Sequence, residues 1–178
     1  MTAYDRIYDA AAENYGLITS GAAESLGVSN MALVMLAKRG RLVRVGRGVY
    51  RLEQHPATEY DAYAALVAKA GKGAFLWGPS VLALDHLCPT DPRTLYVAVP
   101  GRVRRSLGPG VVVKTGVDDV KPVLTHGIAA QSIADAIRAS KGIIMDERLR
   151  DAAERARDAG LMLKDDYRVL RKELKDAE

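Results

Sequence analysis

The pattern of apolar and polar residues at the start of the chain predicts a helix followed by a short strand. Apolar residues recur at helical spacing from Tyr4 to Tyr15. Gly16 ends this helix, because glycine readily adopts the left-handed conformation of a helix stop. The apolar run at 17–19 then predicts a short strand or extended link.

Two further short helices are predicted, separated by a tight turn. The first ends at Leu26, and the hydroxyl of Thr19 or Ser20 can cap it by accepting a free backbone N–H. The second spans residues 30–39, with Ser29 as its cap. This part of the chain therefore predicts a helix pair joined by a turn.

A hairpin is predicted directly after these helices. Two β-prone runs, 42–45 and 49–52, flank the glycine-bearing tip Gly46-Arg47-Gly48. The order of helix, helix, tight turn, helix and basic hairpin is that of a winged helix-turn-helix. We therefore expect residues 1–56 to form such a domain, ending in a linker that contains Pro56.

Residues 57–178 mix helix and strand patterns, which predicts a small α+β domain. We expect strands at 74–77, 94–99 and 111–114, an extended piece ending near Ile128, and helices at 60–70, 79–87, 130–139, 146–159 and 165–175. Arg102, Arg104 and Arg105 fall on the connection between the second and third of these strands. The predicted fold class is α+β throughout.

Charge is distributed unevenly along this pattern. The net charge is +4, and the stretch from Ser25 to Leu52 has no acidic residue but six basic ones. The segment 141–178 is balanced, with ten basic and ten acidic residues. A cationic stretch on such a scaffold favours nucleic-acid binding over a merely solvated basic face.

The start of the predicted helix at 30–39 carries the candidates for reading DNA sequence. In a helix-turn-helix the second helix enters the major groove with its first residues at the base edges. These residues are Ser29, Asn30 and Met31. Asn30 can pair with an adenine edge, and Ser29 with the free N–H groups of the helix start can hold a phosphate.

The basic residues of the same segment are candidates for phosphate contacts. Lys38, Arg39 and Arg41 lie at the far end of the helix, and Arg44, Arg47 and Arg51 lie along the hairpin. Such contacts provide affinity and register but read no sequence directly. Arg47, between two glycines, either reaches into a minor groove or only decorates the turn.

The predicted recognition helix is unusually apolar. Leu33, Leu36 and Ala37 form its natural core face, which leaves Met31, Val34 and Met35 facing outward or sideways. Exposed apolar side chains of this kind can touch thymine methyl groups, or they can form a protein docking surface. The second hypothesis is therefore a protein-interaction module without sequence-specific DNA binding.

No catalytic or metal-binding constellation is recognisable. The three histidines are widely spaced, and none has a second ligand at metal-binding spacing. Cys88 lies near His86 but has no activating motif, which favours a small buried cysteine. We expect no cofactor, no metal and no enzymatic activity; a nucleotide-processing enzyme is the third and least favoured hypothesis.

The chain has the features of a cytoplasmic protein. The stretch that follows Met1 shows no basic run leading into an apolar segment, so no signal peptide is expected. The apolar runs are too short to span a bilayer, and the single cysteine fits a reducing compartment.

The segment from Gly16 to Leu52, GLITSGAAESLGVSNMALVMLAKRGRLVRVGRGVYRL, resembles the N-terminal domain of AbiEi-type antitoxins from type IV toxin–antitoxin systems. The stretches LWGPSVLALDHL, TLYVAVP and HGIAAQSIADAI in the second half also resemble this family, in the expected order. The resemblance implies a transcriptional autorepressor that binds operator repeats in double-stranded DNA. It further implies that the C-terminal domain counteracts a nucleotidyltransferase toxin without forming a stable complex with it.

Overall fold

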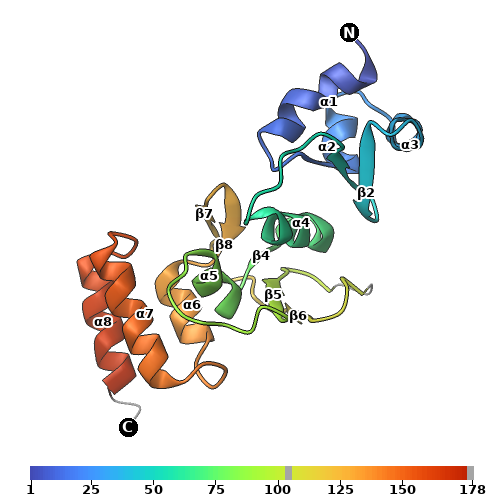
Figure 1. The fold of residues 1–178 in the computed structure, drawn as a ribbon. Helices are drawn as coiled ribbons and strands as arrows, with labels where there is room; N and C mark the ends of the chain where they lie inside the picture. The colour runs from blue at the N-terminus through green and yellow to red at the C-terminus, as the bar shows by residue number, and fades with distance from the viewer. Residues whose placement is uncertain (103–105, 176–178) are drawn as a thin grey trace. The chain divides into compact units, whose positions relative to one another are not determined.

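The chain folds into helices and two β-sheets, which confirms the predicted α+β class (Figure 1). The computed structural model describes residues 1–102 and 106–175, so Arg104 and Arg105 lie outside the described residues. Two compact units are present, Met1–Lys72 and Gly73–Glu178. No helix of the described residues is long and apolar enough to cross a membrane.

Four helices and one sheet form the N-terminal unit. Its elements are α1 (Ala3–Ala12), β1 (Leu17–Thr19), α2 (Ser20–Ser25), α3 (Asn30–Lys38), β2 (Leu42–Gly46), β3 (Val49–Leu52) and α4 (Asp61–Ala70). Side-chain caps fix where two of the helices begin: the Thr19 hydroxyl accepts from the Ala22 N–H at 3.1 Å, and the Ser29 hydroxyl accepts from the Ala32 N–H at 3.2 Å. The starts of α2 and α3 predicted from these caps therefore agree with the structure.

The sheet of this unit has β3 in its centre, between β1 and β2, and all pairs are antiparallel. Ile18 pairs with Tyr50, so the two side chains lie on one face of the sheet. Both belong to the core that this face shares with α1, α2 and α3, in which Ile7 and Leu33 are fully buried. The packing of these helices on the sheet is therefore the main hydrophobic core of the unit.

Helix α4 contacts β1 on the other side of the same unit. Arg51 of β3 pairs with Leu17, and their face of the sheet also carries Val49. Leu17 and Val49 are only 2% and 3% exposed. Lys69 of α4 lies so close to Gly46 that a Cβ at this glycine would be 2.7 Å from its side chain. These contacts cover the outer face of the sheet.

A cluster of polar side chains connects the start of α4 to the β2–β3 hairpin. The Asp61 carboxylate accepts from the Thr58 hydroxyl at 2.6 Å, and lies 3.2 Å from His55 Nε2 and 3.7 Å from Arg51 Nη1. Burial alone would raise the pKa of the Asp61 carboxyl, but hydrogen bonds from Thr58 and His55 outweigh it and lower the pKa.

The division between the units lies after Lys72, whereas the boundary predicted from sequence lies after residue 56.

The described residues of the C-terminal unit form a mixed five-stranded sheet and four helices. Its elements are β4 (Phe75–Leu76), α5 (Pro79–Leu84), β5 (Leu95–Ala98), β6 (Val111–Lys114), β7 (Val123–Thr125), β8 (Ile128–Ala130), α6 (Ile133–Ala139), α7 (Asp146–Asp158) and α8 (Lys164–Lys175). The strand order is β6-β5-β4-β8-β7, with β4–β8 and β5–β6 parallel and the other pairs antiparallel. Figure 1 shows α7 and α8 side by side.

Three predicted elements of this unit differ from the structure. The extended piece near Ile128 is a hairpin, β7–β8, that turns at His126 and Gly127, which have φ of 51° and 75°. The next helix therefore begins at Ile133 and not at 130. Helix α5 ends at Leu84 and not at 87, and His86 has a φ of 53°. His86 and His126 adopt the left-handed region, which is uncommon for residues other than glycine, so the sequence did not indicate these conformations.

Candidate nucleic-acid interface

Helix α3 presents a mostly apolar outer face. Leu33 is fully buried, and Ala32, Leu36 and Ala37 pack against the same core. Residues 30, 31, 34, 35 and 38 occupy the opposite arc of the helix, because positions three and four apart share a face. We call these five residues the outer face of α3. The predicted core face is thus confirmed, with Ala32 as an additional member.

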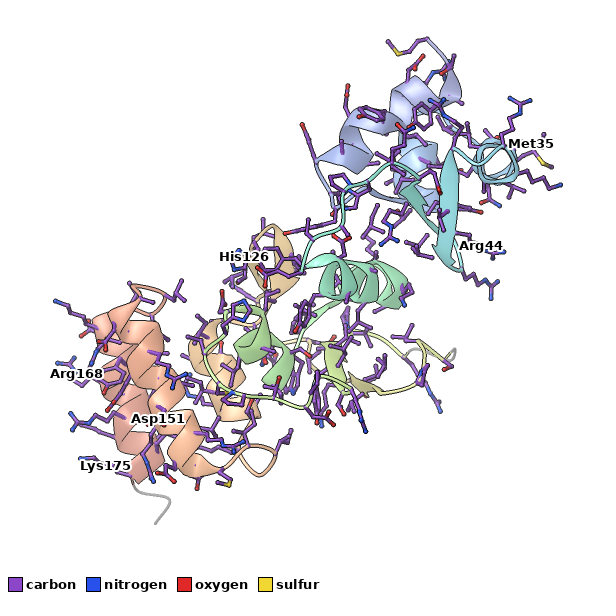
Figure 2. The ribbon with its side chains drawn as sticks, viewed as in Figure 1. Met35, Arg44, His126, Asp151, Arg168 and Lys175 are labelled. Carbon is purple, nitrogen blue, oxygen red and sulfur yellow. The ribbon has the colours of Figure 1, made fainter. Side chains whose placement is uncertain are left out.

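The two methionines are the most prominent side chains on this face. Met31 is 70% exposed and Met35 is 39% exposed, whereas Val34 is half-buried. Figure 2 shows Met35 on the outside of the unit. The outer face of α3 therefore offers apolar atoms to solvent, with a polar side chain at each end: Asn30 and Lys38.

Ser20, at the start of α2, joins the first residue of α3 to the hairpin tip. Its hydroxyl donates to Asn30 Oδ1 at 3.1 Å, and its backbone N–H donates to the Gly48 carbonyl at 2.8 Å. Gly48 has a φ of +68°, and a Cβ there would approach Ser20 Oγ to 3.2 Å. Glycine suits this position, because it adopts positive φ without strain. The start of α3 and the tip of the hairpin are therefore held next to each other.

Arg44 and Arg47 lie on the hairpin near this junction. Both side chains are exposed, and Arg44 Nε donates weakly to the Gly46 carbonyl at 3.4 Å. Arg44 pairs across the hairpin with Tyr50, so its side chain leaves the sheet on the face that carries the helices. Strand β2 also contacts α3. Arg44 therefore lies on the α3 side of the hairpin, as Figure 2 shows at the end of β2.

Lys38, Arg39 and Arg41 gather at the other end of α3. All three are exposed. The Arg41 guanidinium lies 4.2 Å from the centre of the Tyr4 ring, a cation–π contact with α1. A groove of about 460 Å³ lies beside them, lined by the start of α1 and by Met35 and Arg39 among others. At the helical rise, Lys38 is about 12 Å from Asn30 along the axis of α3.

The acidic residue of this groove is already engaged by α1. The Asp5 carboxylate accepts from the Thr2 N–H at 2.7 Å, and the Thr2 hydroxyl accepts from the Asp5 N–H in return. The hydrogen bonds of Thr2 lower the pKa of the Asp5 carboxyl. The carboxylate thus stabilises the N-terminus of α1.

Arg51 is separated from the other cations by the sheet. It alternates with Tyr50 and Leu52, whose side chains lie in the helical core. Its own side chain, 34% exposed, pairs with Asp61 of α4. Of the predicted residues, the structure therefore brings Ser29, Asn30, Met31, Arg44 and Arg47 to one end of α3 and Lys38, Arg39 and Arg41 to the other, and it leaves Arg51 on the opposite face.

Ser20 is a positioning residue that the sequence suggested only as a helix cap. Its contacts link residues 10 and 28 positions apart, to Asn30 and Gly48, and no local pattern encodes such distances. In the sequence, Gly48 was the residue that could have indicated the contact with Ser20, because a glycine often marks a place where another part of the chain approaches the backbone closely.

Two of the histidines considered for metal binding contact carboxylates instead. His55 contacts Asp61, and His126 Nε2 lies 2.9 Å from Asp85 Oδ1. Cys88 is buried as predicted, and burial raises the pKa of its thiol. Within residues 1–102 and 106–175, no three His, Cys, Asp or Glu side chains are grouped to hold a metal ion.

Comparison with known families confirms the resemblance at the N-terminus. Residues 5–53, which run from α1 to just after β3, match the family model described as "Transcriptional regulator, AbiEi antitoxin". This description names a regulator and not an enzyme. No curated protein matches the chain. Among solved structures, the RV2827C protein from Mycobacterium tuberculosis is similar at 16% identity and a TM-score of 0.40, over 96% of this chain and 80% of that one.

Proposed function

We propose that this chain is a DNA-binding transcriptional autorepressor and the antitoxin of a type IV toxin–antitoxin system. The observation that carries the DNA-binding part is the Ser20 bridge, which holds Asn30 at the start of α3 beside the hairpin tip that bears Arg47. The match of residues 5–53 to the AbiEi regulator family supports the same proposal.

In this proposal α1, α2, α3 and the β2–β3 hairpin act as a winged helix-turn-helix. Helix α3 is the recognition helix and enters the major groove with Ser29, Asn30 and Met31 foremost. The hairpin is the wing, and Arg47 at its tip reaches the adjacent backbone or minor groove. The side-by-side placement of helix start and hairpin tip supports this arrangement, because one duplex can then meet both.

The cations supply affinity in this scheme and the helix start supplies specificity. Lys38 and Arg39 meet phosphates beyond the far end of α3, and Arg44 and Arg47 meet phosphates beside its start. Arg41 contributes less, because Tyr4 holds its guanidinium against α1. Arg51, paired with Asp61 behind the sheet, is not part of the contact surface.

Replacing Arg44 and Arg47 together by alanine is expected to weaken binding to all duplexes alike, by roughly tenfold or more. Both side chains are exposed, so the fold is retained while two phosphate contacts are lost. Fluorescence polarisation with several unrelated duplexes measures the effect. The matched control is Arg168→Ala, which removes a 71% exposed arginine from α8. Unchanged affinity in the double variant would refute the wing assignment.

The antitoxin part of the proposal assigns toxin neutralisation to the C-terminal unit. Operator repeats and a nucleotidyltransferase toxin are the partners that the resemblance implies, and no cofactor is required. Co-expression with a nucleotidyltransferase encoded beside this gene is expected to relieve the growth arrest that the toxin causes alone. Persistent growth arrest at full expression of this chain would contradict the antitoxin role and leave DNA binding unaffected.

The alternative function is a protein-interaction module that docks through the outer face of α3. The exposure of Met31 and Met35 favours it, since exposed apolar patches often mark interfaces. Absence of DNA binding at low salt, together with co-purification of a defined partner that Met31→Ala releases, would favour this alternative over the proposal.

A further inference from the structure

We infer that α3 recognises thymine methyl groups, so that the chain selects sites whose major groove presents thymines to Met31, Val34 and Met35. The inference rests on the proposed DNA-binding function and specifies the base chemistry that the same surface reads. It starts from the composition of the outer face of α3, which is apolar along most of its length.

Hydrogen-bond readout by this helix is limited to one residue. The sequence of α3, NMALVMLAK, contains no arginine, glutamine, glutamate or aspartate. The common side-chain contacts to guanine, through arginine, and to cytosine, through an acidic residue, are therefore missing from the helix. Lys38 lies in the last turn, away from the helix start that meets the base edges in this class of domain. Within α3 itself, Asn30 remains as the hydrogen-bonding reader, and the Ser29 hydroxyl before it caps the helix by accepting from the Ala32 N–H.

Met31, Val34 and Met35 provide the apolar contact instead. Positions 31 and 35 are one turn apart and position 34 lies between them, so the three side chains form one stripe. The methionines are 70% and 39% exposed and have long, flexible side chains that adapt to a surface. The thymine methyl is the apolar group that the major groove of unmodified DNA presents.

The bridge from Ser20 engages the Oδ1 atom of Asn30 and so determines which group of the amide is presented to a base. Because the Ser20 hydroxyl donates to Asn30 Oδ1, the amide NH₂ of Asn30 is the group left to face outward. A donor there suits O4 of thymine, N7 of a purine or O6 of guanine. Thymine offers both this acceptor and the methyl, and therefore satisfies the amide and the stripe together.

Charge complementarity makes DNA the occupant of this stripe and not a protein. Exposed cations bound it at both ends, Arg44 and Arg47 beside the start of α3 and Lys38 and Arg39 at its end. No acidic residue lies between Ser25 and Leu52. An apolar strip between two cationic borders fits the major groove, where methyl groups lie between two phosphate backbones.

The test replaces thymine by uracil, which lacks only the methyl group. Full-length protein is used to enrich binders from a random pool of duplexes of about two helical turns. The enriched pool and the starting pool are then each amplified with dTTP or with dUTP, and fluorescence polarisation gives the Kd of all four. Burial of one methyl corresponds to an about fourfold change in Kd. With two or more thymines contacted, the enriched thymine pool is expected to bind about tenfold tighter than its uracil form.

Two comparisons assign the effect to the helix. The starting pool should bind equally in both forms, because its binding is electrostatic. Replacing Met31 and Met35 together by alanine should bring the thymine-to-uracil ratio of the enriched pool close to one. Met145→Ala, which shortens a 60% exposed methionine of the C-terminal unit, should leave the ratio unchanged.

Each outcome bears on one of the two proposals. Equal Kd values for the two enriched pools, with binding that still falls steeply with salt, would overturn the thymine inference and leave the proposed function standing. A ratio that persists in the methionine double variant would overturn the assignment to these side chains. Failure of the protein to retain any duplex at low salt would overturn both and indicate a protein partner for the outer face of α3.

Discussion

Raising the monovalent salt concentration from about 50 mM to about 200 mM is expected to weaken the binding of this chain to duplex DNA roughly a hundredfold. Each phosphate contact releases condensed counterions and adds about −0.9 to the slope of log K against log salt. Four exposed cations border the outer face of α3: Lys38, Arg39, Arg44 and Arg47. They predict a slope of about −3.6 per chain. A polarisation titration at several salt concentrations measures it.

The placement of each cation makes the salt slope informative. The Arg44→Ala, Arg47→Ala double variant should halve the slope, because it removes two of the four contacts. Arg51→Gln should leave the slope unchanged, since Arg51 pairs with Asp61 on the opposite face of the sheet. Circular dichroism verifies that this variant is folded. A flat salt response of the unmodified protein would contradict the whole cationic surface, and a reduced slope in Arg51→Gln would contradict its assigned face.

Leu33→Ala is expected to lower the free energy of unfolding of the N-terminal unit by about 2–5 kcal/mol. Leu33 is fully buried and is the residue of α3 that enters the core of the unit most deeply. The cost combines the lost transfer of the side chain from water with the cavity that it leaves. Urea denaturation followed by far-UV circular dichroism measures the change in the full-length protein.

Met35→Ala is the matched control for this substitution, because it shortens an exposed side chain of the same helix. We expect it to change the free energy of unfolding by less than about 0.5 kcal/mol. The single tryptophan, Trp77, belongs to the C-terminal unit, so its fluorescence follows that unit separately. An unchanged free energy of unfolding of the N-terminal unit in Leu33→Ala would show that α3 is not held by this core.

The N-terminal elements could be predicted closely because their ends are marked by local chemistry. The hydroxyls of Thr19 and Ser29 cap the helices that follow them. Gly40 has a φ of 68° directly after the end of α3, as predicted, whereas α1 ends at Ala12 and not at the Tyr15 that Gly16 predicted. A cap or a stop depends on a few neighbouring residues, so a pattern read along the chain is sufficient to locate it.

The faces of the candidate site were harder to predict, because they depend on partners far along the chain. The alternation of Tyr50, Arg51 and Leu52 predicts that the arginine points away from its neighbours. It does not predict that Asp61 receives the arginine. Likewise, the sequence predicts Asn30 as a base-contacting residue but does not predict the Ser20 hydroxyl that donates to its Oδ1.

The C-terminal hairpin was missed for a different physical reason. His126 adopts positive φ in front of Gly127, and a pattern that expects glycine or asparagine at such a turn overlooks it. The alanines at 129 and 130 then resemble the start of a helix, although Ala130 is paired in β8 with both β4 and β7. Pairing with strands far away in sequence overrode the local helical preference.

The position of α4 has a practical consequence for anyone isolating the N-terminal half. A fragment cut at the predicted linker, after residue 56, would lose the helix that shields Leu17 and Val49 and would leave Arg51 without its carboxylate. The apolar surface of its strands would then be exposed to solvent and could associate with other copies of the fragment. The minimal autonomous fragment should extend through Lys72, because the residues that follow position 56, including α4, belong to the N-terminal unit.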